Sequence, residues 1–251
     1  MATWRGLLIL IVTLAILFLL QGCGKEKTAC VYVLIDQTAG SQAVREMYTT
    51  EFKKVVEALG SGDMIGISAI TENSEQTATT KASFIFPTFN VFSDSELVYK
   101  AKVAQLKNEV QDTGTKMLSQ NATNSDIMGG FRLAGKILSG QEGQKHIRRI
   151  LIIFTDGIEQ ENASDFTRDG ELSGGNIQQI IDREQKLARL PDLKGVEVHF
   201  VGVYLKPDPQ AGITREKMSE IQEFWTKYCA ASGTTLDTSH YGPNLTDFNL
   251  E

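Results

Sequence analysis

The chain has 251 residues, of which 41% are hydrophobic, and its formal net charge at pH 7 is -6. An acidic chain without a run rich in lysine and arginine argues against nucleic acid and anionic lipid as partners. The length suits one α/β domain with insertions, built around a single sizeable core.

The first 22 residues have the three regions of a signal peptide, namely a short basic start, an apolar run and a small residue before a cysteine. The apolar run, residues 6–20, would rise ~22 Å as a helix, which is short of the roughly 30 Å hydrocarbon core that a spanning segment crosses. The ending Leu-Gln-Gly-Cys23 resembles the lipobox of bacterial lipoproteins, in which the cysteine is acylated and becomes the mature N-terminus. An uncleaved membrane anchor is the alternative.

The lipobox resemblance implies a division of the chain and an address. Residues 1–22 are expected to be a lipoprotein signal peptide, residues 23–29 a linker to the lipid anchor, and residues 30–251 the folded domain. Acyl chains such as palmitate on Cys23 would hold the protein stably at a membrane surface. The expected location is therefore the bacterial cell envelope, on the periplasmic or outer-membrane face.

Beyond the linker, short apolar segments alternate with segments of helical period, which predicts a Rossmann-like, doubly wound, mainly parallel sheet flanked by helices. The third strand should pair with the second through a polar turn. Strands are expected over residues 31–35, 64–70, 83–86, 150–154 and 196–204, with a sixth edge strand over 234–236. Helices are expected over residues 44–59, 97–118 (one long helix, or two that divide near Gly114), 125–138, 177–190 and 218–228.

Two of the buried strands end in an aspartate, because VYVLI runs into Asp36 and ILIIFT runs into Asp156. In an open parallel sheet, ligands bind beyond the carboxyl ends of the strands, where the strand order reverses. If these strands flank that crevice, both carboxylates meet there. Ser125, the expected N-cap of the following helix, would present its hydroxyl to the same place. Two like charges held close repel, and a hard cation with oxygen ligands offsets this repulsion.

These motifs, in this order, resemble the von Willebrand factor type A (vWA) domain: DQTAGS after the first strand, a hydroxyl residue opening the helix SDIMGGFRLA, and a buried strand ending FTDG. The resemblance spans roughly residues 31–237 and implies the vWA fold. It also implies a metal-ion-dependent adhesion site. Asp36 and Thr38 match the first two ligand positions, Ser125 takes the position of a threonine, and Asp156 takes the last position.

One ligand position departs from the family pattern. Gly40 stands where the second hydroxyl of the first loop is expected, and Ser41 follows one residue late. A one-residue bulge could bring Ser41 within reach, or water could fill the position, because Mg²⁺ commonly keeps several waters. A degenerate site without metal is the alternative.

The resemblance implies a membrane-anchored adhesion or scaffold module rather than an enzyme. Its cation would be Mg²⁺, or another divalent ion such as Mn²⁺ or Ca²⁺, and a carboxylate of a partner protein would complete the coordination. Loops over residues 71–81, 157–175 and 205–212 would select that partner. A Mg²⁺-dependent phosphoryl-transfer hydrolase is one alternative, although the chain lacks the second acid two residues after Asp36 that such enzymes use. A metal-free structural lipoprotein is another.

Two cysteines remain once Cys23 carries lipid. Cys30 precedes the first strand and Cys229 lies near the end of the last helix, so both are expected at the same edge of the sheet, where an oxidising compartment would allow a disulfide. Their lateral distance is open, and a bridge requires Cα atoms within about 7 Å. The alternative is two buried thiols that act as small hydrophobes.

Other residue types that bind metals lack the spacing of a site. His146, His199 and His240 show no metal-ligand spacing and are interpreted as ordinary surface or strand residues. Asp169-Gly170 faintly resembles a calcium loop, but the residues around it do not follow the full pattern. The carboxyl edge of the sheet is therefore the one metal site that we predict.

Overall fold

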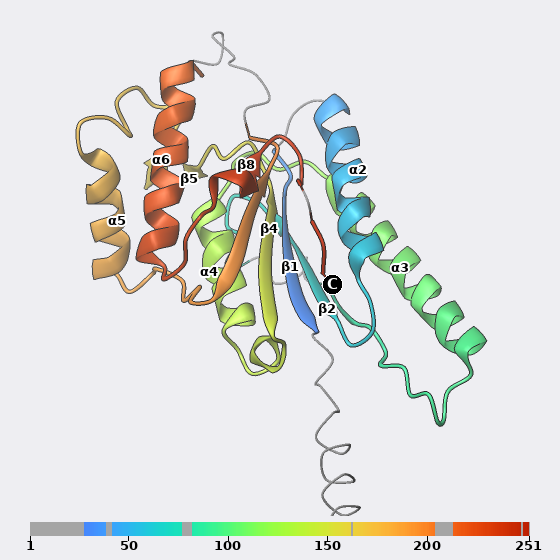
Figure 1. Ribbon diagram of the computed structural model, residues 1–251. Coiled ribbons are helices and arrows are strands. Elements are labelled where there is room, and N and C mark those ends of the chain that lie inside the picture. Colours follow the sequence, from blue (N-terminus) through green and yellow to red (C-terminus); the bar gives the residue numbers. More distant parts are fainter. Residues whose placement is uncertain are drawn as a thin grey trace, which may run out of the picture.

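The computed structural model describes residues 28–38, 42–76, 82–161, 163–203, 213–246 and 248–250. Its middle layer is a six-stranded sheet in the order β3-β2-β1-β4-β7-β8 (Figure 1). Every neighbouring pair is parallel except β3, which runs antiparallel to β2 as predicted. The strands are β1 Ala29–Asp36, β2 Met64–Ile70, β3 Ala82–Ile85, β4 Arg148–Phe154, β7 Val196–Val201 and β8 Tyr241–Gly242. A second, two-stranded sheet pairs β5 (Gln160–Glu161) with β6 (Ser164–Asp165).

Helices cover both faces of the six-stranded sheet (Figure 1). Helices α2 and α3 share one apolar core with the sheet, and α4, α5 and α6 share the other. This arrangement confirms the doubly wound α/β fold class. The helices are α2 Gln42–Ala58, α3 Glu96–Leu118, α4 Ile127–Leu138, α5 Asn176–Lys186 and α6 Arg215–Ala231, with short 3-10 helices η2 Gly143–Lys145 and η4 Thr238–His240.

The central strand β1 is buried along its whole length. Successive side chains of a strand point to opposite faces, so Tyr32 and Leu34 enter the core under α4, α5 and α6, whereas Val31 and Val33 enter the core under α2 and α3. A strand covered on both faces needs a continuous apolar run, which explains why the segment before Asp36 has no polar residue.

Helix α3 is one continuous helix, so the division considered near Gly114 does not occur. Gly114 instead allows α3 to pack closely on α2. A Cβ atom on Gly114 would lie 2.1 Å from Cε1 of Phe52, which no real contact allows. The glycine is therefore explained by a close helix approach rather than by a chain break.

The predicted edge strand over residues 234–236 is wrong, and the sixth strand is β8. After α6 the chain lies beside the first residue of β7, where the Thr234 hydroxyl donates to the carbonyl of Val196 at 2.6 Å. It then passes through η4 and pairs in parallel with the far half of β7, with Tyr241 opposite Phe200. The strand therefore forms later in the chain than apolar composition suggested.

The disulfide between Cys30 and Cys229 is also wrong, because both cysteines are free and buried. Burial raises the pKa of the Cys30 thiol to about 11 and that of the Cys229 thiol to about 12. On the face of the sheet that holds both cysteines, α4 packs directly on β1, whereas α6 packs beside α5. The two residues share one core but are offset laterally, so they act as small hydrophobes, as the alternative held.

Candidate metal centre

The carboxyl ends of β1 and β4 lie side by side at the place where the strand order reverses. Strand β1 has β2 on one side and β4 on the other. Ile35 pairs with Phe154, so Asp36 and Thr155, the next residue in each case, lie side by side. Asp36 ends β1, and Thr155 and Asp156 directly follow β4. The predicted crevice flanked by these strands is therefore present.

The Asp36 carboxylate gathers hydrogen-bond donors from three segments. It is buried, with 3% of its surface exposed. Its Oδ1 accepts from the backbone N–H of Thr38 at 2.9 Å, from the Thr38 hydroxyl at 2.7 Å and from the Ser125 hydroxyl at 2.9 Å. Its Oδ2 accepts from the Thr155 hydroxyl at 2.7 Å. Three of the predicted residues thus meet, and Thr155 joins them.

Thr155 belongs to the cluster around Asp36, although we did not predict it. It is fully buried, its hydroxyl donates to Asp36, and the same hydroxyl accepts from the N–H of Gly157 at 3.1 Å. Gly157 has φ +83°, a conformation that favours glycine, and lets the chain turn directly after Asp156. The signal in the sequence was a hydroxyl residue placed between a buried strand and an Asp-Gly turn.

Ser125 does not cap α4, which corrects the predicted N-cap by one residue. Asp126 is the cap, and its carboxylate accepts from the N–H of Gly129 at 2.7 Å. The Ser125 hydroxyl is therefore left for Asp36 and Thr38. The Ser125 carbonyl accepts from the N–H of Gln160 in β5 at 2.8 Å, which anchors the residue between two loops.

Asp156 lies at the outer side of the crevice and is exposed by surface area. Its Oδ1 accepts from the N–H of Ile158 at 2.9 Å. Partial desolvation by the surrounding protein atoms, followed by the negative charge of Asp36, raises the pKa of Asp156 to about 7. The negative charge of Asp36 thus opposes the ionisation of Asp156.

Tyr48 of α2 lies next to both carboxyls in the interior. Burial raises the pKa of Tyr48 well above its ordinary value, and the charges of Asp156 and Asp36 add to the rise. Among the described residues, its hydroxyl is buried without a hydrogen-bond partner. Tyr48 is therefore a neutral donor near the two carboxyls that no group among the described residues satisfies.

The donor set fits a hard divalent cation. Asp36, Thr38, Ser125 and Asp156 supply carboxylate and hydroxyl oxygens, which are the ligands that Mg²⁺, Mn²⁺ and Ca²⁺ prefer. A cation would offset the repulsion between the Asp36 and Asp156 carboxyls. Water bound to that cation could accept a hydrogen bond from the Tyr48 hydroxyl, which has no partner among the described residues. Ser41, the fifth predicted ligand, lies outside the described residues.

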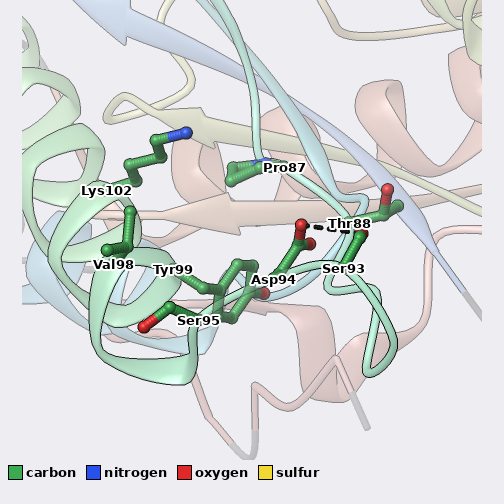
Figure 2. A pocket seen from close by; sticks show the side chains of 8 residues that line it. All are labelled: Pro87, Thr88, Ser93, Asp94, Ser95, Val98, Tyr99 and Lys102. Atoms are coloured by element: carbon green, nitrogen blue, oxygen red, sulfur yellow. Dashed lines mark hydrogen bonds between the residues drawn. The ribbon is translucent and has the colours of Figure 1, made fainter.

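A surface hollow lies at the opposite edge of the sheet, between the β3–α3 connection and the first turns of α3 (Figure 2). Ile85, which ends β3, pairs with Met64 at the start of β2, and Met64 pairs with Cys30 near the start of β1. The hollow is therefore beyond the amino ends of the parallel strands, and the residues that line it include none of the predicted site. Its lining residues are Pro87, Thr88, Ser93, Asp94, Ser95, Val98, Tyr99 and Lys102.

No protein-family model matches the sequence, and no curated protein matches it either. Among solved structures, the pilus adhesin SpaC from Lactobacillus rhamnosus GG is similar, with a TM-score of 0.50, 12% identity and coverage of 87% of this chain and 28% of that one. A von Willebrand factor type A protein from Catenulispora acidiphila has a TM-score of 0.44 at 12% identity, over 82% of this chain and 43% of that one. The minor pilin PilB from Streptococcus sanguinis has a TM-score of 0.42 at 12% identity, over 86% of this chain and 57% of that one.

This chain spans less than two thirds of each of these proteins, at 28%, 43% and 57% of their lengths. At such low identity the likeness concerns the fold. The strand order and the order of the motifs fit a vWA-like domain, as the sequence resemblance predicted. Within the part of the chain that the structure describes, no helix combines the length and the apolar character that a membrane span requires. Cys23 and the residues before it lie outside that part.

Proposed function

We propose that the protein is a membrane-anchored module that binds a partner protein through a divalent cation, Mg²⁺ in the first place. The observation that carries the proposal is the convergence of Asp36, Thr38, Ser125 and Asp156 at one exposed edge of a rigid sheet. Thr38 and Ser125 would offer neutral hydroxyl oxygens, and the two carboxylates would hold the ion in place.

The chemistry of the site supports a partner that presents a carboxylate. Asp36 already spreads its charge over four hydrogen bonds, so it would neutralise a cation only in part. A divalent ion held otherwise by hydroxyls and water keeps net positive charge and attracts an anionic ligand. The loops that follow β2 and β4 surround this edge and would decide which carboxylate can approach.

The proposed lipid on Cys23 would orient this edge away from the membrane. Strand β1 begins at Ala29 and ends at Asp36, so its eight residues separate the two edges of the sheet by about 26 Å at ~3.3 Å per residue. The linker over residues 23–29 would reach at most about 25 Å when extended. The anchor would therefore enter at the amino edge and present the metal centre to partners outside the membrane.

Exposed apolar side chains support a membrane at the amino edge. Phe92 is 96% exposed, and Ile147 lies beside the start of β1, where its N–H donates to the carbonyl of Thr28. Single exposed apolar residues are ordinary, but several gathered at one end point to an interface. Besides these two, the exposed large apolar residues near this edge are Ile85, Val91, Leu97 and Val98.

The phosphoryl-transfer alternative is less well supported by the contacts of Asp36. Such enzymes use a second acid two residues after the nucleophile, whereas this chain has Thr38 there, whose hydroxyl donates to Asp36. An assay with an aryl phosphate and Mg²⁺ distinguishes the two functions, and steady turnover that Asp36→Asn abolishes would favour the hydrolase.

The proposal is tested with the full chain in detergent. Calorimetry should detect Mg²⁺ binding by the wild type, and capture of a partner from envelope extract should require Mg²⁺ and fail with EDTA. Asp156→Ala should lose both Mg²⁺ binding and partner capture, whereas the control Asp192→Ala should keep both. The Asp192 carboxylate also accepts a hydrogen bond from the N–H two residues later, that of Lys194, but it lies far from Asp36. A wild type that binds no Mg²⁺, or captures its partner equally well in EDTA, would contradict the proposal.

Mass spectrometry of the native protein should find acylated Cys23 at the N-terminus.

A further inference from the structure

We propose a second cation site, formed by Glu197, His199 and His240, that takes a divalent transition metal of the zinc type. One ligand atom from each residue lies within 4.8 Å of the other two. The interpretation of these histidines as ordinary residues, made from their spacing in the sequence, is thereby revised. This site is separate from the Asp36 crevice and does not depend on the function proposed for it.

The fold brings the three residues together at the β7–β8 edge. Glu197 and His199 are two residues apart on β7 and therefore point to the same face of the sheet. His240 ends η4, directly before β8, and β8 pairs alongside β7. The rings of His199 and His240 stack with centroids 3.8 Å apart and planes at 24°. His199 and His240 meet only because β8 pairs with β7, so no short sequence motif marks the site.

The donor atoms suit a different metal from that of the first site. Two imidazole nitrogens with one carboxylate favour Zn²⁺, Cu²⁺ or Ni²⁺ over Mg²⁺, which prefers oxygen ligands. In tetrahedral Zn²⁺ sites the ligand atoms lie about 3.3 Å apart, given Zn–N bonds of about 2.0–2.1 Å. His199 Nε2 and Glu197 Oε1 are 2.7 Å apart and share one proton. A small separation of these two atoms would let a cation take the place of that proton.

Surrounding groups hold the ligands in position. The Arg148 guanidinium donates to Glu197 Oε2 at 3.0 Å and to the carbonyl of Asn249 at 2.7 Å, which fixes the carboxylate and leaves Oε1 facing His199. Such outer contacts orient ligands in metal sites. The positive charge of Arg148 opposes a cation, whereas the negative charge of the exposed Asp237, which interacts electrostatically with both imidazoles, favours one. Asp237 also accepts from the N–H of Ser239 at 2.8 Å, which stiffens the turn that carries His240.

The position of the site distinguishes it from the Asp36 crevice. His199 pairs with Ile152 of β4, which is two residues below the Phe154 that ends that strand. Strand β7 is two strands away from β1, which corresponds to about 10 Å across the sheet. The ring of Phe248 packs edge-on against His199, with centroids 5.9 Å apart, so the site lies under the C-terminal segment. A bound metal would tie η4 and β8 to the sheet.

The test is a Zn²⁺ titration of the full chain against a chromophoric chelator, with excess Mg²⁺ present. We expect one Zn²⁺ per chain in the wild type, and at least tenfold weaker binding in His240→Ala and in Glu197→Gln. His146→Ala is the matched control and should bind as the wild type does, because His146 contacts Thr28 at the other end of the sheet. Circular dichroism checks that each variant is folded.

Three results would overturn this proposal. They are a wild type without saturable Zn²⁺ binding, a His240→Ala variant with unchanged affinity, and an Asp156→Ala variant that loses the Zn²⁺. The last result would place the zinc in the Asp36 crevice. Asp156→Ala should instead keep its Zn²⁺ while it loses Mg²⁺, so that failure of either site is seen separately.

Discussion

Replacing Asp156 by asparagine should stabilise the metal-free protein while it removes the response to Mg²⁺. Asparagine keeps the shape of the side chain and an oxygen for the Ile158 N–H, but it carries no charge to oppose Asp36. The difference between the pKa of about 7 and the ordinary value of 3.8 corresponds to about 4 kcal/mol, at about 1.4 kcal/mol for each pKa unit. Because Asp156 is exposed, solvent screening reduces this figure, and we expect about 1–2 kcal/mol.

The sign of the pH dependence follows from where the proton is held more tightly. Between about pH 4 and pH 7 the folded protein keeps the proton of Asp156 and the unfolded chain has lost it. This contribution to the free energy of unfolding therefore falls in the wild type as the pH rises through that window. The free energy of unfolding of Asp156→Asn lacks this fall. Its excess over the wild-type value should therefore be near zero at pH 4 and fully developed at pH 8.

Urea unfolding measures both effects on the same samples. In EDTA at pH 8, Asp156→Asn should unfold at higher urea than the wild type. With Mg²⁺ at ten times its Kd, the wild type should gain about 1.4 kcal/mol, and the variant clearly less. Asp192→Asn is the control and should change neither quantity. A variant that is less stable than the wild type in EDTA at pH 8, or that gains equally from Mg²⁺, would refute the reasoning.

Three further predictions concern stability and the thiols. Thr155→Val keeps the shape of the side chain but deprives the Asp36 carboxylate and the Gly157 N–H of a buried partner, so urea unfolding should show a loss of about 2–4 kcal/mol. Gly114→Ala should destabilise by about 1–2 kcal/mol in the same assay, because the clash with Phe52 outweighs the better helix propensity of alanine; a stabilised variant would contradict the close packing of α3 on α2. The two described cysteine thiols should react with a thiol reagent only after unfolding, and their absence in denatured, unreduced protein would instead reveal a disulfide.

Much of the site could be predicted because its residues are tied to strand ends. A buried parallel strand must be apolar, so the change to Asp36 or to Thr155 and Asp156 marks its carboxyl end in the sequence. Once two such strands are adjacent at the reversal of strand order, their terminal residues meet. The meeting of Asp36, Thr38 and Ser125 was predictable for this reason.

Competition between neighbouring groups was harder to predict. Ser125 and Asp126 can both cap a helix, and the structure gives the cap to the aspartate, whose carboxylate reaches two N–H groups, those of Gly129 and Ser74. The choice depends on the second N–H group, which arrives from a distant loop. Propensity within the segment therefore could not decide which of the two side chains would be left for the cluster around Asp36.

The sequence by itself determined the order and type of the five helices and of strands β1 to β4 and β7. It also determined the two aspartates at the carboxyl ends of the central strands, because periodicity and strand ends are properties of adjacent residues. Only the tertiary structure decided the lateral relations: that Cys30 and Cys229 do not meet, that β8 rather than residues 234–236 forms the edge, and that His199 and His240 stack. Each of these depends on how helices and strands pack across the sheet. That packing is set by the fit of side chains from many segments at once, and no local pattern encodes it.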